Sequence, residues 1–174
     1  MTKPQPLQRL SVGVVLEKRK LNHPWAEFSW RAVAVLPGVP DTAPCTMLDE
    51  QHEVWRFYAG ASEIELFAAS GSYYRDNLAS GEPSLWVVLR PTGLDPPFEV
   101  FAVTADPNEG EAFTQAGNDL VEAVAMPDAV REAIEAFVAE HRVETQFVKR
   151  QRDMADPEAL ARRAPAAKRD HDGG

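Results

Sequence analysis

Apolar residues alternate with polar or small ones along several short segments of the chain, which is the period of a β-strand. A first strand is expected over residues 10–17, where Val12, Val14 and Leu16 share one face. A second is expected over residues 30–36, and its later half is apolar on both faces. Strands of that kind are usually central in a sheet, so residues 30–36 are predicted to be covered on both sides.

Four further segments have strand-like composition. Residues 53–58 and 63–68 are joined by a short segment that contains Gly60, which is typical of a hairpin. Residues 85–90 and 98–104 are rich in β-branched and aromatic side chains. The connections between these segments are too short for helical crossovers, so neighbouring strands are predicted to be antiparallel.

Helical patterns follow in the second half of the chain. Asp106 and Pro107 form a helix start, and that helix is expected to end at Gly117. Residues 120–125 predict a short strand. Residues 127–142 place apolar side chains on one face and charges on the other, which is the pattern of an amphipathic helix. Residues 73–78 are expected to form a single helical turn.

The order of these segments predicts an α+β fold. We expect a mostly antiparallel sheet or partly open β-barrel of six to seven strands, with two C-terminal helices packed against it. Residues 1–8 are predicted to be a loose N-terminus and residues 9–148 a single domain. Residues 149–174 lose the aromatic residues and gain Ala and Arg, so they are expected to form a flexible basic tail.

Charge is unevenly distributed along the 174 residues. The formal net charge is −9, but residues 149–174 carry seven Lys/Arg against five Asp/Glu, so the tail is positive and the body strongly negative. An acidic body repels phosphate backbones, which disfavours nucleic-acid binding. No apolar run is long enough to span a bilayer. The N-terminus lacks the pattern of a signal peptide, and Cys45 is the one cysteine, so a cytoplasmic location without membrane insertion is predicted.

Candidate catalytic and metal-binding patterns are weak. The four histidines have no metal-ligand spacing, Cys45 lies in a proline-flanked loop, and no phosphate-binding glycine motif occurs. Glu63 and Glu65 share one face of a predicted strand, but alternating charge is ordinary on a half-exposed strand. We therefore predict no catalytic residue, no metal and no cofactor, and whether the protein is an enzyme stays open, with a non-enzyme favoured.

The side chains best suited to binding are aromatic residues, arginines and one asparagine in two segments. Trp, Tyr and Arg bury much surface and retain a polar group, so they are common in interfaces. Trp25 is the strongest candidate because it lies in a predicted loop, whereas Trp30 and Trp86 are expected in the core. The candidate binding residues are Trp25, Phe28, Arg31, Tyr73, Tyr74, Arg75 and Asn77.

Four sequence segments carry a resemblance to a known family. They are HPWAEFSWRAVAVLPG (23–38), YYRDNL (73–78), EPSLWVVLR (82–90) and FVKR (147–150). They resemble a bacterial family of unknown function, over roughly residues 8–152, whose genes are commonly found beside those of molybdenum formate dehydrogenases. The resemblance implies an accessory or maturation role and assigns no catalytic residue.

Two functional hypotheses follow. The first is a non-enzymatic accessory protein that binds a formate dehydrogenase subunit or an assembly factor of that enzyme. The second is a small-molecule binder or enzyme that holds an anion in a barrel-mouth pocket. Its expected walls are Trp25, Arg31, Tyr73, Tyr74 and Arg75.

Overall fold

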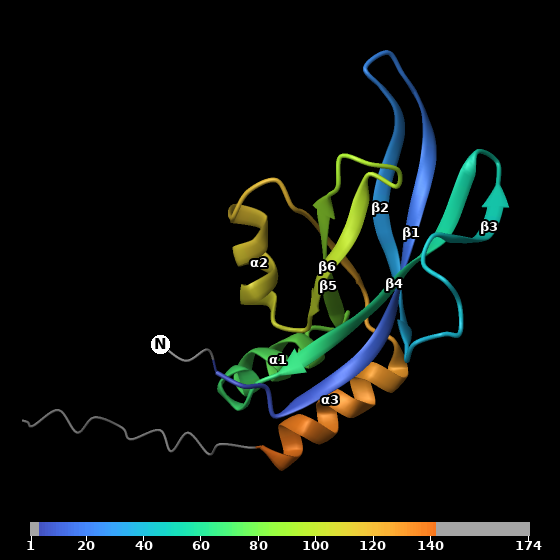
Figure 1. Cartoon of the computed structure of the whole chain (residues 1–174). Helices are drawn as coiled ribbons and strands as arrows, with labels where there is room; N and C mark the ends of the chain where they lie inside the picture. Colours follow the sequence, from blue (N-terminus) through green and yellow to red (C-terminus); the bar gives the residue numbers. More distant parts are fainter. Residues whose placement is uncertain (1–3, 142–174) are drawn as a thin grey trace, which may run out of the picture. The chain divides into compact units, whose positions relative to one another are not determined.

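Two antiparallel sheets and three α-helices make up residues 4–141, the part of the chain that the computed structural model describes (Figure 1). The first sheet has the order β2-β1-β4-β3, with β1 at Gln8–His23, β2 at Ala26–Pro37, β3 at Thr46–Gln51 and β4 at Val54–Leu66. The second has the order β6-β5-β7, with β5 at Ser84–Pro91, β6 at Phe98–Thr104 and β7 at Leu120–Ala125.

The helices are α1 at Gly71–Ala79, α2 at Pro107–Gln115 and α3 at Asp128–Glu140, and a short 3-10 turn, Ala68–Ser70, precedes α1. Helix α2 begins as predicted, because the Asp106 carboxylate accepts a hydrogen bond from the Asn108 backbone N–H. Helices α1 and α3 lie together at the end of the molecule opposite the tip of the β1–β2 hairpin (Figure 1). The predicted tail, residues 149–174, lies outside the described residues.

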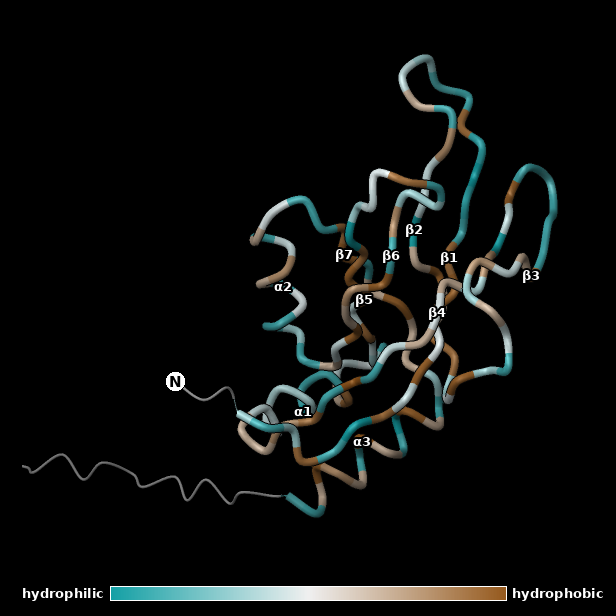
Figure 2. Tube along the Cα trace, in the orientation of Figure 1, coloured by the Kyte–Doolittle hydropathy of each residue, from teal (hydrophilic) through white to brown (hydrophobic). Residues whose placement is uncertain are grey.

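The core forms where the two sheets face each other and α3 covers them. Val12, Val14 and Leu16 of β1 are at most 2% exposed, and Ile134 and Phe137 supply the apolar face of α3. In Figure 2, hydrophobic residues gather where the strands of the two sheets meet, whereas the projecting ends of β1 and β3 are mainly hydrophilic. Each fully buried Val, Leu or Ile contributes about 1.5–3 kcal/mol to folding. The core therefore occupies only one half of the long strands.

The predicted α+β class with a mostly antiparallel sheet is confirmed. Strands β6 and β7 have the predicted bounds. Strand β4 lies beside β6, and β2 lies beside β7, but these neighbours do not share a ladder of hydrogen bonds. Within residues 4–141 the strands thus form two sheets and not one closed barrel.

The predicted hairpin at Gly60 is wrong. Residues 53–68 belong mainly to one continuous strand, β4, because Gly60 makes a bulge and not a turn. Val14 pairs with Gly60 and Val15 pairs with Tyr58, which leaves Ala59 as an extra residue on β4. Gly60 has φ +131°, a conformation that other residues rarely adopt. The glycine that indicated a turn instead bends a strand.

The predicted central position of residues 30–36 is also wrong. The central strand is β1, which pairs along most of its length with β2 on one side and β4 on the other. Strand β1 continues past Glu17 to His23, and β2 begins at Ala26, so the two form a long hairpin. Strand β3 was not predicted, because every residue in it is exposed and no apolar alternation marks it. A strand that projects beyond the core has no buried face, so its sequence shows no alternation of apolar and polar residues and does not predict a strand.

Candidate functional site

The projecting part of β1 carries its side chains alternately to two faces of the first sheet. In the strand register, Glu17 lies directly opposite Arg31 of β2 and Arg56 of β4. The next residue, Lys18, lies opposite Trp30 of β2 and Trp55 of β4. Directly opposed residues in antiparallel strands share a face. One face is therefore built around a carboxylate and the other around an ammonium group.

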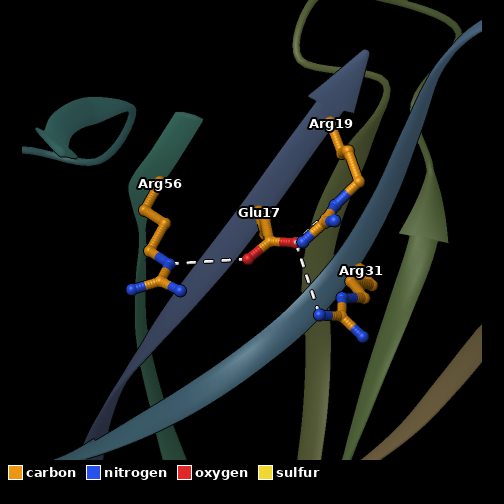
Figure 3. A network of polar contacts seen from close by, with 4 residues as sticks. All are labelled: Glu17, Arg19, Arg31 and Arg56. Carbon is orange, nitrogen blue, oxygen red and sulfur yellow. Dashed lines mark hydrogen bonds and ion pairs between the residues drawn. The ribbon is translucent and has the colours of Figure 1, made fainter. Parts of the chain in front are cut away.

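Glu17 is surrounded by three guanidinium groups (Figure 3). Its Oε1 lies 3.1 Å from Arg19 Nη2 and 3.4 Å from Arg31 Nη2, and its Oε2 lies 3.5 Å from Arg56 Nε. The Glu17 side chain is 1% exposed, whereas the three arginine side chains are each about half exposed, at 51–55%. We call these four residues the Glu17 cluster. The arginines cover the carboxylate and keep much of their own surface open.

Two opposing effects act on the pKa of Glu17. Burial alone raises the pKa, because it removes the charged form from water. The hydrogen bond and charge of Arg19, together with Arg31 and Arg56, outweigh that effect and hold the pKa below its ordinary value. Glu17 is therefore ionised at neutral pH, and the cluster carries three positive charges against one negative charge. The surplus stands out in a chain whose net charge is −9.

The opposite face gathers four aromatic rings around Lys18. Phe28 and Trp55 meet edge to face with ring centroids 6.0 Å apart, and Trp30 stacks on Phe57 at 6.0 Å. Lys18 Nζ lies 4.0 Å from the centroid of Phe28 and within 6 Å of the two tryptophan rings. We call the four rings the aromatic quartet. Such cation–π contacts hold an ammonium group in place without neutralising its charge.

A hollow of about 290 Å³ opens next to the aromatic quartet. Its walls come from β1, β2 and β4 on one side and from the β5–β6 connection and β6 on the other. The lining residues are Leu16, Lys18, Trp30, Cys45, Phe57, Ala59, Asp95, Pro96 and Phe98. A second hollow of about 280 Å³ shares several of these residues and extends the space towards Leu94. The hollow is mostly apolar, and Lys18 and Asp95 provide its charged groups.

Three of the predicted binding residues lie on the β1–β2 hairpin. Trp25 is 89% exposed at the turn, where its backbone N–H donates to His23 Nδ1. Phe28 belongs to the aromatic quartet and Arg31 to the Glu17 cluster, so their side chains lie on opposite faces. Of the three, only Trp25 is fully available at the surface.

The other four predicted residues belong to α1, at the far end of the molecule (Figure 1). Tyr73 and Arg75 are exposed, whereas Tyr74 is 1% exposed and Asn77 is 6% exposed. The Tyr74 hydroxyl accepts a hydrogen bond from the Phe67 N–H, and burial raises the pKa of Tyr74. These residues do not meet Trp25 or Arg31 in one surface or one hollow.

Asn77 has a structural role that the sequence did not reveal. Its side-chain amide donates to the carbonyl oxygens of Ser84 and Ala105, at 2.8 and 3.0 Å, and its Oδ1 accepts from the Ser84 N–H. These bonds tie α1 to the start of β5 and to the chain just after β6. Buried amides that are satisfied in this way stabilise the fold and are not free to bind a partner.

Sequence reasoning missed Glu17, Lys18, Arg19, Trp55 and Phe57 as site residues. The first three were placed where the first strand was expected to end, because the run of charges resembled a loop. A period-two reading continued through this run would have put Glu17 with Arg19 and separated both from Lys18. The register of β1 against β2 and β4 decides that Lys18 meets Trp30 and Trp55 and that Glu17 meets the arginines. No pattern among neighbouring residues in the sequence indicates that register.

Between residues 4 and 141, no group of three or more His, Cys, Asp or Glu side chains is arranged to hold a metal ion. In the same range no helix is both long and apolar enough to cross a bilayer. Glu63 and Glu65, considered as an acid–base pair, are both within 3.7 Å of Arg9 Nε in exposed ion pairs.

The fold and the two faces define an α+β protein of two antiparallel sheets, with a projecting hairpin that carries a charged face and an aromatic face. Within that class, the chain belongs to the family described as "Protein of unknown function (DUF3305)", whose model matches residues 11–151. The expected membership of a family of unknown function is thereby confirmed. No curated protein and no solved structure matches the chain.

Proposed function

We propose that this protein acts by binding another protein, as a non-enzymatic accessory or maturation factor. The observation that carries the proposal is Trp25, which is 89% exposed at the turn of a long hairpin. A tryptophan presents a large apolar surface and an N–H donor, and it is among the residues most often found at the energetic centre of interfaces. An exposed tryptophan lowers the solubility of the unbound protein. A partner that covers Trp25 would give a physical reason for its exposed position.

Two further features support a protein partner near the same hairpin. Met47 and Leu48 of β3, which β4 separates from the hairpin in the first sheet, are 52% and 49% exposed and add apolar surface to that sheet. The Glu17 cluster adds half-exposed arginines, which suit a polar rim around an apolar centre. The partner class proposed here, a molybdenum formate dehydrogenase subunit or an assembly factor of that enzyme, comes from the family resemblance. A cytoplasmic location is proposed separately, because the single cysteine, Cys45, fits a reducing compartment.

The experiment is affinity purification of the full chain at its native level, comparing wild type with Trp25→Ala. We expect Trp25→Ala to reduce recovery of a partner at least about tenfold, the effect of removing an interface hot spot. Leu7→Ala is the matched control, because Leu7 is 58% exposed and its backbone N–H is bonded to Leu66, at the other end of β1. Circular dichroism and thermal unfolding check that both variants fold.

Two results would contradict the proposal. If both variants recover the same proteins in the same amounts, the hairpin turn is not the interface. If no formate dehydrogenase subunit or assembly factor is recovered, and deletion of the gene leaves formate oxidation intact, the proposed partner class is wrong.

A further inference from the structure

The hollow beside the aromatic quartet has features of a ligand site that the protein-binding role does not explain. We infer that it binds a flat, mostly apolar small molecule with one anionic group, of the aromatic carboxylate or sulfonate class. The inference is independent of the proposed function, because Trp25 does not line this hollow.

The walls account for the apolar part of the ligand. Trp30 and Phe57 stack at an interplanar angle of 24°, so they form one aromatic wall, and Pro96 and Phe98 contribute from the other side. Flat aromatic groups stack well against such rings. A volume of about 290 Å³ is close to the lower end of the range for small-molecule sites. The ligand is therefore expected to be compact.

Lys18 accounts for the anionic group. Its ammonium lies among aromatic rings, and within residues 4–141 no carboxylate lies close enough to form an ion pair with it. A charge in a partly apolar wall attracts an anion more strongly than a charge surrounded by water. Lys20, two residues later on the same face of β1, is instead paired with Glu53 at 3.2 Å. Lys18 thus lines the hollow without an ion-pair partner among residues 4–141, whereas Lys20 has one.

The wall formed by the β5–β6 connection disfavours a ligand with more than one anionic group. Asp95 also lines the hollow and carries a negative charge that would repel a second anionic group. Cys45 lines it too and is the one cysteine of the chain, so it reports directly on occupancy. The β5–β6 connection that carries Asp95 is held in place, because the Thr92 hydroxyl donates to the Pro96 carbonyl and the Thr92 N–H to the Pro97 carbonyl.

The test uses the purified full chain and two fluorescent probes that share an aromatic body. The anionic probe is 8-anilinonaphthalene-1-sulfonate, and the neutral probe is N-phenyl-1-naphthylamine, which lacks the sulfonate. We expect saturable one-to-one binding of the anionic probe, and a loss of affinity of about tenfold in Lys18→Met. The neutral probe is expected to bind both proteins equally, because only the sulfonate contacts Lys18.

Lys20→Met is the matched control and should bind both probes as the wild type does. Occupancy is located by the rate at which 5,5′-dithiobis-(2-nitrobenzoate) modifies Cys45, which bound probe should slow several-fold. Lys18→Gln provides a second neutral variant if Lys18→Met does not fold, as judged by circular dichroism.

Three results would overturn the inference. The first is the absence of saturable binding of the anionic probe to the wild type. The second is equal affinity of that probe for the wild type and the neutral Lys18 variant. The third is an unchanged rate of Cys45 modification at saturating probe, which would place the bound molecule elsewhere.

Discussion

Glu17 and Lys18 are consecutive residues with opposite charges, and they lie on opposite faces of the same strand. Glu17 is buried beneath three arginines, so its charge is compensated more than fully. Lys18 lies among aromatic rings, and no carboxylate within residues 4–141 is close enough to pair with it. The first arrangement holds three strands together through charge. The second leaves a charge available beside a hollow, which is the arrangement expected of a binding group.

Removal of the Glu17 charge is expected to destabilise the fold strongly, whereas removal of the Lys18 charge is expected to change its stability little. The largest effect is expected for Glu17→Gln, which leaves three guanidiniums around a neutral amide. We expect the free energy of unfolding, measured by urea denaturation, to fall by about 2–4 kcal/mol, less than for a fully buried charge because the arginines are half exposed. Glu63→Gln is the control, since Glu63 is an exposed glutamate of β4 paired with Arg9, and it should cost about 0–1 kcal/mol. Equal effects would show that the Glu17 cluster is not a stabilising centre.

Acid should remove part of the same stabilisation. The pKa of Glu17 is lower in the folded protein than in the unfolded chain, because the arginines outweigh the effect of burial. Its contribution is therefore complete above the unfolded pKa of about 4.3 and is lost as the pH falls through the folded pKa. We expect the free energy of unfolding between pH 6 and pH 3 to fall more for wild type than for Glu17→Gln. Parallel pH profiles would contradict this.

A smaller effect is expected when one arginine of the cluster is removed. Arg31→Gln leaves Arg19 and Arg56 to neutralise Glu17, so the loss should be about 0.5–1 kcal/mol at low ionic strength. Moderate salt should reduce this loss, since the arginine side chain is 55% exposed. A double-mutant cycle of Arg31→Gln with Glu17→Gln measures the coupling, and additive effects would mean that the pair does not interact.

The smallest effect on stability is expected for Lys18→Met. The methionine retains a long side chain that packs on the aromatic quartet, while the unpaired charge disappears. We expect the free energy of unfolding to change by no more than about 0.5 kcal/mol in either direction. A loss as large as that of Glu17→Gln would mean that the two faces do not differ as described, and that Lys18 is part of the structural frame.

Local sequence patterns were sufficient for the elements near the core. The alternation of apolar residues identified β6 and β7, and the Asp106–Pro107 pair identified the start of α2, because strand period and helix capping depend on neighbouring residues. The apolar face of α3 was predicted from the helical spacing of its apolar residues, which is also a pattern among neighbouring residues. The sequence also singled out Trp25, because it lies in a predicted loop ahead of the second strand, and it is 89% exposed.

The site depended on contacts that no local pattern contains. Which residues meet Glu17 and Lys18 is decided by the register of β1 against β2 and β4, and a shift of one residue would exchange the two faces. The partners come from segments up to 39 residues apart, so only the folded chain brings them together. The sequence by itself thus determined the α+β class and several strands and helices. The tertiary structure decided that the run Glu17–Lys20 is a strand with a charged face and an aromatic face, because cross-strand pairing is non-local.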